Sequence, residues 1–328
     1  MKNLLFLLCM LALSWSCSSS SGEEPNPEPV PGQPKEHIVS LGLTGEIDIE
    51  ESPLSKASGS DLYGVQVFQK AGNSYYPYAY GLFDDKNKMS IKLIEGAYYK
   101  FAITMIVNGK KVIYGSGNPH VYSFPFHTSI SNNFIYDNQK ELLVSSAGGD
   151  IYFDDTHENF GYPNIERFYG ETEDYNLSMG ETVSVYMKRV CFGVKFIVEG
   201  LTEGKLKINI HNAPPLTIYA GETEIQDIFA MYGFSTQINE ETIITNNISV
   251  SVYWEKDNGD TLLLYDQIIT FKRNVLTTIT IKVKDGSTNN NTHSKIDINQ
   301  ESGEMTQGDN ITMESGTGLD GNVDPVEN

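Results

Sequence analysis

The chain has 328 residues, a formal net charge of −20 and three cysteines. Nucleic acids and anionic membrane surfaces attract basic patches, so a chain this acidic is expected to bind neither. Without the N-terminal leader and tether described below, roughly 290 residues remain, which exceeds the usual size of one core and predicts two domains.

Residues 1–16 have the features of a secretory signal peptide. Lys2 supplies a positive charge, an apolar run follows from Leu4, and small residues stand at Ser14 and Ser16. This run is too short to span a bilayer, which needs about 20 apolar residues. We therefore predict that residues 1–16 are removed.

Cys17 follows the leader directly, and the small-x-small-Cys pattern resembles the lipobox of bacterial lipoproteins. The resemblance implies that the Cys17 thiol is acylated and that this residue becomes the mature N-terminus. The alternative is ordinary cleavage near Ser18, which would release a secreted protein without lipid. Residues 17–35 are rich in Ser, Pro, Gly and Glu, a composition that buries too little surface to fold, so we expect an extended tether.

Residues 36–165 are predicted to form a first β-sandwich. Runs of β-branched and aromatic residues are separated by Gly, Asn, Asp and Pro, and helical periodicity is scarce. Asn108-Gly109 stands between two apolar runs and predicts a type I′ hairpin turn, because this dipeptide tolerates positive φ angles.

A tyrosine-rich segment in this half is the strongest candidate for a binding surface. Alternate residues of a strand share one face, so three of the four residues Tyr75, Tyr76, Tyr78 and Tyr80 can lie together, and these four are the candidate platform on which sugar rings stack. The interpretation we favour over this platform is that these rings pack in the core or against a neighbouring strand, where aromatic residues are common.

Residues 166–285 are predicted to form a second β-sandwich, with the domain boundary near residue 165. Asn258-Gly259 predicts another type I′ hairpin, which joins residues 250–254 to residues 262–264. A short helix is expected at 224–231, because Ile225, Ile228 and Phe229 follow helical spacing. Cys191 lies in an apolar strand pattern and is interpreted as a buried core thiol rather than a reactive one.

Residues 286–328 form a polar tail. We expect at least the last ten residues to be disordered, although 295–299 and 310–314 have the pattern of a late hairpin.

No motif for catalysis or metal binding stands out. The six histidines never occur as HxH, HxxxH or HExxH, and the glycine-rich phosphate loops and nucleophile elbow are absent. Residues 154–158 (DDTHE) carry ligands suited to Ca²⁺ but are interpreted as an exposed loop, and residues 255–260 (EKDNGD) as a hairpin tip. We therefore predict no enzyme activity, no cofactor and no metal site.

Several stretches together resemble the fimbrillin-like and Mfa-like lipoproteins, the subunits and anchors of type V pili. These stretches are SLGLTGEI, YGVQVF, YMKRVCFGVKFIVEGL and KRNVLTTITIKVKD. The resemblance implies two tandem transthyretin-like β-sandwich domains, lipid anchoring at the outer membrane with exposure at the cell surface, and contacts with pilus or surface proteins along sheet edges. The implied function is adhesion, pilus assembly or anchoring; the alternative is a carbohydrate-binding accessory lipoprotein of a glycan-uptake system.

The chain departs from this family at the activation site. Polymerising members are cut after an arginine near the start of the first domain, so that a neighbour can supply the lost strand. All three arginines of this chain follow residue 165, and the corresponding stretch reads Ser55-Lys56-Ala57. Lys56 is therefore the candidate for proteolytic processing, and an anchor, tip subunit or stand-alone adhesin that keeps its first strand is the alternative.

Overall fold

The computed structural model describes residues 35–46, 60–116, 120–123, 125–142, 151–153, 158–231, 245–283, 301–304 and 309–314. Strands dominate these residues, which confirms the all-β prediction. The helical elements are short: α1 (Gly109–Val112) and the 3-10 turns η2 (Lys86–Lys88) and η4 (Leu177–Met179). Within the described ranges, no helix has the length and apolar character that a membrane span requires.

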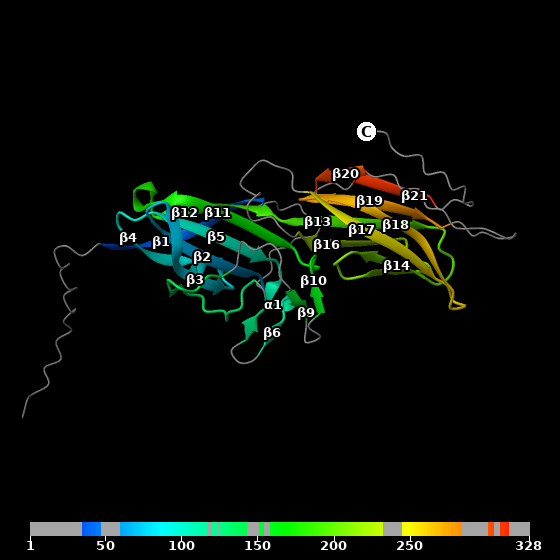
Figure 1. Ribbon diagram of the computed structural model, residues 1–328, viewed down its shortest axis with the longest axis horizontal. Coiled ribbons are helices and arrows are strands. Elements are labelled where there is room, and N and C mark those ends of the chain that lie inside the picture. The colour runs from blue at the N-terminus through cyan, green and yellow to red at the C-terminus, as the bar shows by residue number, and fades with distance from the viewer. Residues whose placement is uncertain are drawn as a thin grey trace, which may run out of the picture. The chain divides into compact units, whose positions relative to one another are not determined.

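The largest sheet has eight strands and is built mainly from the first half of the chain (Figure 1). In spatial order its strands are β4 (Ser90–Ile94), β1 (Glu36–Gly45), β12 (Thr182–Arg189), β11 (Arg167–Tyr175), β5 (Tyr99–Ile106), β2 (Leu62–Ala71), β3 (Ser74–Phe83) and β8 (Ile135–Tyr136).

This sheet folds around its own core. One set of alternate residues on most of its strands is buried, as in β12, where Val183, Val185 and Met187 face inward between exposed neighbours. Residues from β1, β2, β3, β4, β5, β11 and β12 belong to one hydrophobic cluster. The sheet is therefore curled, because both ends of its strand order contribute to the same interior.

Tyr78 and Tyr136, near one end of the curled sheet, and Tyr99 of β5 all bond to β4 at the other end, and we call these three residues the tyrosine seam. The Tyr136 hydroxyl accepts a hydrogen bond from the Lys92 backbone N–H at 2.9 Å, and the Tyr78 hydroxyl donates to the Lys92 carbonyl at 3.0 Å. The Tyr99 hydroxyl accepts from the Ile94 N–H at 2.9 Å. Side-chain hydroxyls thus satisfy backbone groups of β4.

The chain passes from the eight-stranded sheet to another sheet at a later point than the predicted domain boundary near residue 165. Strands β11 and β12 follow that boundary, yet β11 pairs with β5 and β12 pairs with β1, both from the first half. Strand β13 (Cys191–Glu199) is the first to join a different sheet. The change of sheet therefore falls between Arg189 and Cys191, while the domain limits as such stay a prediction.

The second half forms two sheets that share a core. One contains β16 (Glu224–Ala230), β13, β19 (Val275–Lys282), β20 (Glu301–Glu304) and β21 (Asp309–Glu314). The other contains β15 (Leu216–Tyr219), β14 (Lys205–Ile210), β17 (Thr245–Glu255) and β18 (Thr261–Lys272). Buried residues of both sheets form one cluster, the arrangement of a β-sandwich.

The helix predicted at 224–231 is wrong, because this segment is strand β16. It pairs antiparallel with β13 from Cys191↔Ala230 to Ile197↔Glu224. Both faces are covered at its last three residues: Phe229 enters the sandwich core, whereas Ile228 enters a separate cluster with Leu62 and Ile106. A strand buried on both faces loses the polar alternation that would have identified it.

The hairpin predicted at Asn108-Gly109 is also wrong. Asn108 does adopt a positive φ of 54°, but the chain then enters α1 instead of a returning strand. The Asn108 backbone N–H donates to the Asp61 carboxylate at 2.9 Å. The next strands, β6 (Gly115–Ser116) and β7 (Val121–Tyr122), pair with each other.

The hairpin at Asn258-Gly259 is confirmed, since β17 and β18 pair antiparallel on either side of it. Its turn is not of type I′, because Gly259 has a φ of 90° while Asn258 is not among the positive-φ residues. The Gly259 N–H donates to the Lys256 carbonyl at 3.0 Å, which closes a turn over residues 256–259.

The remaining described strands are β9 (Ile151–Phe153) and β10 (Glu158–Phe160), which pair with each other, and the tail strands β20 and β21. Residues 310–314, expected in a late hairpin, lie in β21, which runs parallel to β19, while β20 pairs antiparallel with β19. Residues 295–299 and the last ten residues lie outside the described ranges.

Candidate functional site at the first strand

Strand β1 is inserted between strands that are remote from it in sequence. It pairs antiparallel with β4 over Glu36–Ser40 and parallel with β12 over Ser40–Gly45. Its successor in the chain, β2, lies elsewhere in the sheet, with β12, β11 and β5 between them. Figure 1 shows β1 in blue beside β12 in green, which makes this early segment an internal strand of the sheet.

Side-chain burial helps to hold β1 in the sheet. Val39 is fully buried, Leu41 is 6% exposed, and Leu43 packs against the same cluster while partly exposed. Full burial of a Val or Leu side chain contributes about 1.5–3 kcal/mol. The spacing of these three residues follows the two-residue period of a strand, so one face of β1 closes the core.

Two hollows flank β1. One, of about 730 Å³, lies at its beginning, where Ile38 and Tyr98 are 68% and 48% exposed and His37 lies 3.9 Å from Glu95. The other, of about 380 Å³, lies beside Leu41–Leu43, next to η2 and past the residues of β1 that pair with β4. Among the described residues, strand β1 thus lacks a paired strand on its β12 side before Ser40 and on its β4 side after Ser40, and one hollow lies at each of these places.

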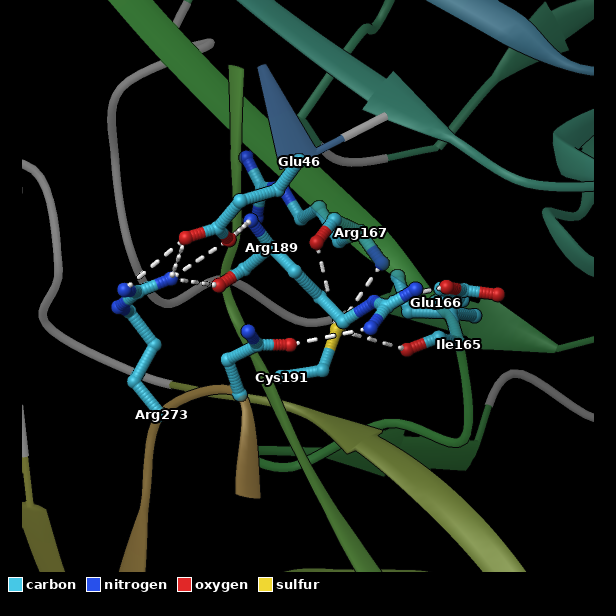
Figure 2. Close-up of polar contacts among 8 residues, drawn as sticks. Glu46, Ile165, Glu166, Arg167, Arg189, Cys191 and Arg273 are labelled. Atoms are coloured by element: carbon cyan, nitrogen blue, oxygen red, sulfur yellow. Dashed lines mark hydrogen bonds and ion pairs between the residues drawn. The ribbon is translucent and has the colours of Figure 1, made fainter. Parts of the chain in front are cut away.

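A carboxylate pins the far end of β1 (Figure 2). Glu46, directly after the strand, accepts hydrogen bonds from Arg273 Nη1 at 2.9 and 3.2 Å and from Arg273 Nη2 at 3.3 Å. Its Oε2 also accepts the Arg189 backbone N–H at 2.6 Å. We call Glu46, the Arg273 guanidinium and the Arg189 backbone amide the carboxylate clasp.

The clasp is largely shielded from water. The side chains of Arg273 and Glu46 are 19% and 15% exposed. Arg273 Nη1 also donates to the Arg189 carbonyl at 2.8 Å, which fixes the guanidinium against the end of β12. Hydrogen bonds to charged groups contribute about 1.5–3 kcal/mol net, more than neutral ones, and shielding from solvent weakens screening by salt.

A second ion pair lies beneath the clasp and is more deeply buried. Arg189 Nε donates to Glu166 Oε1 at 2.9 Å, with side chains 1% and 5% exposed, and Arg189 Nη1 donates to Asn274 Oδ1 at 3.0 Å. Burial raises the pKa of Glu166 despite the nearby Arg189 charge, because desolvation disfavours the carboxylate. Arg189 Nη2 is buried without a hydrogen-bond partner, which lowers the stability of the folded state.

Cys191 lies beside these charges as a buried free thiol, which confirms its prediction as a core residue. Its Sγ accepts the Arg167 backbone N–H at 3.0 Å, and the thiol lies 3.5 Å from the Ile165 carbonyl oxygen (Figure 2). Burial raises the pKa of Cys191 to about 12, and it lowers the pKa of the fully buried Arg167 to about 10. The thiol is therefore protonated and unreactive at neutral pH.

The four predicted platform tyrosines do not share one exposed face. A bulge in β3 leaves Tyr78 without a partner opposite Val67 and Phe68 of β2, which interrupts the alternation of β3. Tyr80 is 6% exposed and belongs to the core cluster of the second half, Tyr78 belongs to the seam, and the Tyr75 hydroxyl donates to Asp174 at 2.8 Å. Tyr76 is exposed, at 55%. The packing interpretation therefore describes these residues better than the glycan platform.

The other sequence-based candidates separate into two groups. Cys17, Lys56 and residues 154–157 lie outside the described residues, so their roles stay predictions. Residues 255–260 form the β17–β18 hairpin tip as expected, with Lys205 and Glu255 in an ion pair at 2.9 Å. Across the ranges that the structure describes, no three His, Cys, Asp or Glu side chains come together as a metal site.

The clasp residues were missed by sequence reasoning. Glu46, Arg189 and Arg273 belong to three separate segments, and their contact depends on β1 joining the sheet beside β12. Two signals were available: arginine is rare in this chain, and both residues stand next to strand boundaries. Neither signal identifies Glu46 as their partner.

Comparisons with known proteins found similarity in structure alone. No family model matches the chain, and no curated protein matches it. A solved structure from Bacteroides eggerthii, described as a candidate cell adhesion protein, is 11% identical with a TM-score of 0.39, covering 88% of this chain and 99% of that one. The fimbrial anchor protein Mfa2 from Porphyromonas gingivalis is 10% identical with a TM-score of 0.32, covering 76% and 91%.

A third solved structure, from Bacteroides thetaiotaomicron, is described as a candidate polysaccharide-binding protein. It is 10% identical with a TM-score of 0.33, covering 70% of this chain and 78% of that one. The structural neighbours thus include adhesion, fimbrial and polysaccharide-binding proteins.

Proposed function

We propose that this chain is a cell-surface lipoprotein, acylated at Cys17, that takes part in adhesion or pilus assembly through contacts along sheet edges. The observation that carries the proposal is the position of β1. This strand follows the predicted tether and fills the space between β4 and β12, which are both supplied by later parts of the chain. Loss of β1 would expose an edge on each of these neighbours and the apolar face beneath Val39 and Leu41.

Such an opening is the geometry that strand addition uses. Main-chain hydrogen bonds to an exposed edge give affinity, and pockets for alternate side chains give specificity. Residues 47–59 join β1 to the rest of the sheet and contain Lys56, so cleavage after Lys56 would cut the covalent link between β1 and β2. In this proposal the uncut chain is an anchor, tip or stand-alone adhesin, and the cut chain accepts a strand from a neighbour.

The test is intact-mass measurement and N-terminal sequencing of the protein purified from its native cell envelope, beside a Cys17→Ala form. A mature chain that begins at an acylated Cys17 supports a tethered anchor, tip or adhesin. A chain that begins at Ala57 supports an activated subunit. A chain that begins near Ser18 without lipid, and that is released from the envelope in both forms, rejects the lipoprotein proposal.

The carbohydrate-binding alternative loses the platform on which it was based, because Tyr78 and Tyr80 are withdrawn into the seam and the core. Retention on glycan columns that depends on Tyr76, the exposed member of the group, would restore this alternative.

A further inference from the structure

The position that β1 occupies ends in groups arranged to bind a carboxylate. Arg273 directs Nη1 and Nη2 at the two oxygens of Glu46, and the Arg189 backbone N–H donates to Oε2. Planar guanidinium groups bind carboxylates in this two-pronged manner, with both strength and directional selectivity. Both arginines lie beyond residue 59, so they stay with the folded chain if β1 leaves it.

We propose that Arg273 and the Arg189 backbone amide select the strand that fills this position, by binding an acidic side chain directly after its last paired residue. This inference rests on the proposed function, in which β1 is replaceable. It adds a chemical requirement that edge pairing alone does not impose, because backbone hydrogen bonds are the same for any sequence.

The register of β1 defines where the acid must stand. The parallel ladder ends at Gly45↔Met187, and Gly45 has a φ of 99°. A Cβ at this position would lie 2.8 Å from the Met187 carbonyl oxygen, so a side chain is strained there on two counts. The glycine turns the chain out of the strand, and the next residue, Glu46, reaches Arg273.

The complete recognition pattern therefore has three parts. Apolar residues occupy alternate positions, as Val39, Leu41 and Leu43 do; a glycine follows two positions after the last of them; and an acid comes next. The fitting partner is an extended segment of a surface protein with this pattern. A segment with a neutral residue in place of the acid would leave the Arg273 charge without its partner in a shielded position, which disfavours its binding.

The first experiment measures how strongly the clasp holds β1 in the full, uncut chain. Glu46→Gln keeps the shape of the side chain but removes its charge, and hydrogen–deuterium exchange followed by mass spectrometry reports on the β1 amides. We expect their exchange to accelerate about tenfold or more, given the usual strength of charge-assisted hydrogen bonds. Arg273→Gln should accelerate exchange similarly, and the double variant should add little.

Glu36→Gln is the matched control. It removes the same charge at the opposite end of the same strand, where Glu36 lies 3.8 Å from Lys92 and both side chains are at least 60% exposed. Solvent-exposed pairs contribute little, so exchange in β1 should stay unchanged. Equal exchange rates in the Glu46 and Glu36 variants would refute the clasp.

The second experiment tests selection. Residues 53–58 are replaced by the recognition sequence of a site-specific protease, the purified chain is cut, and labelled peptides of residues 36–46 compete with the resident β1. A peptide of the native sequence, which ends in Glu46, should replace β1 and remain bound about tenfold more tightly than the same peptide with the Glu46→Gln substitution. Equal binding of the two peptides would overturn the inference while leaving strand exchange intact.

Failure of both peptides to enter has a different meaning. If the uncut Glu46→Gln chain still shows faster exchange of β1, the clasp holds this strand but the strand is not replaceable. That outcome rejects strand exchange in the proposed function, and with it the selection of an incoming strand.

Discussion

In the tyrosine seam, removal of one hydroxyl group is predicted to change the stability of the protein by different amounts at two positions. Tyr99→Phe and Tyr136→Phe each remove one hydroxyl that accepts a β4 backbone N–H at 2.9 Å. Tyr99 is fully buried, whereas Tyr136 is 50% exposed. Water can replace the lost acceptor at Tyr136, but the Ile94 N–H beside Tyr99 is left largely without one.

We expect Tyr99→Phe to lower the free energy of unfolding by about 1–2 kcal/mol, the usual cost of a shielded donor without a partner. Tyr136→Phe should lower it by less than about 0.5 kcal/mol, because its donor can bond to water. Urea unfolding followed by far-ultraviolet circular dichroism measures both, with similar slopes required for the comparison. Equal losses, or a larger loss for Tyr136→Phe, would refute the argument that burial sets the value of these hydroxyls.

Three further predictions concern the core and the buried charges. Phe192→Ala should lower the free energy of unfolding by about 3–5 kcal/mol in denaturant titrations, because this buried ring stacks on Phe271 at 4.7 Å and contacts Phe229 at 5.6 Å; a loss below about 1 kcal/mol would contradict this packing. Burial raises the pKa of Glu166, so its contribution to stability is fully present below its unfolded pKa near 4.5 and is lost as pH rises through its folded pKa. The free energy of unfolding of Glu166→Gln, relative to that of the native chain, should therefore increase as pH rises through this window. A difference that does not change with pH would show that the pKa of this carboxyl is not perturbed. Cys191, with its pKa raised to about 12, should react with a thiol reagent only at the rate of unfolding, and rapid labelling of the native chain would place it at the surface.

Strands with one exposed face were predictable from sequence. In β12, polar and apolar residues alternate, and the structure buries the apolar set. Segment 224–231 could not be assigned in this way, because the last three residues of β16 are covered on both sides and its apolar residues mimic helical spacing. Asn108 shows a related limit: its left-handed backbone was foreseeable, but the Asp61 carboxylate that directs the following turn lies in another segment.

The candidate site depended on long-range pairing that local patterns do not encode. The apolar alternation of β1 identifies a strand, yet nothing in residues 36–46 specifies β12 as its parallel neighbour. Without that neighbour, Glu46 and Arg273 have no reason to meet. The tyrosines illustrate the converse, since a regular spacing suggested one face and a bulge in the pairing of β2 with β3 separated them.

The position of β1 also has a mechanical consequence. If the chain is held at Cys17, a load on the remainder of the protein reaches the sheet through the beginning of β1, at Glu36. A load directed along the strand would act on the hydrogen bonds to β4 and β12 together, so they would resist sliding as a group instead of opening one after another. At the opposite end, Glu46 is fastened to Arg273, which lies after β18, and this fastening opposes withdrawal of the strand. Under such a load the first strand would be the element through which the protein bears force, and its attachment would fail by shear rather than by peeling.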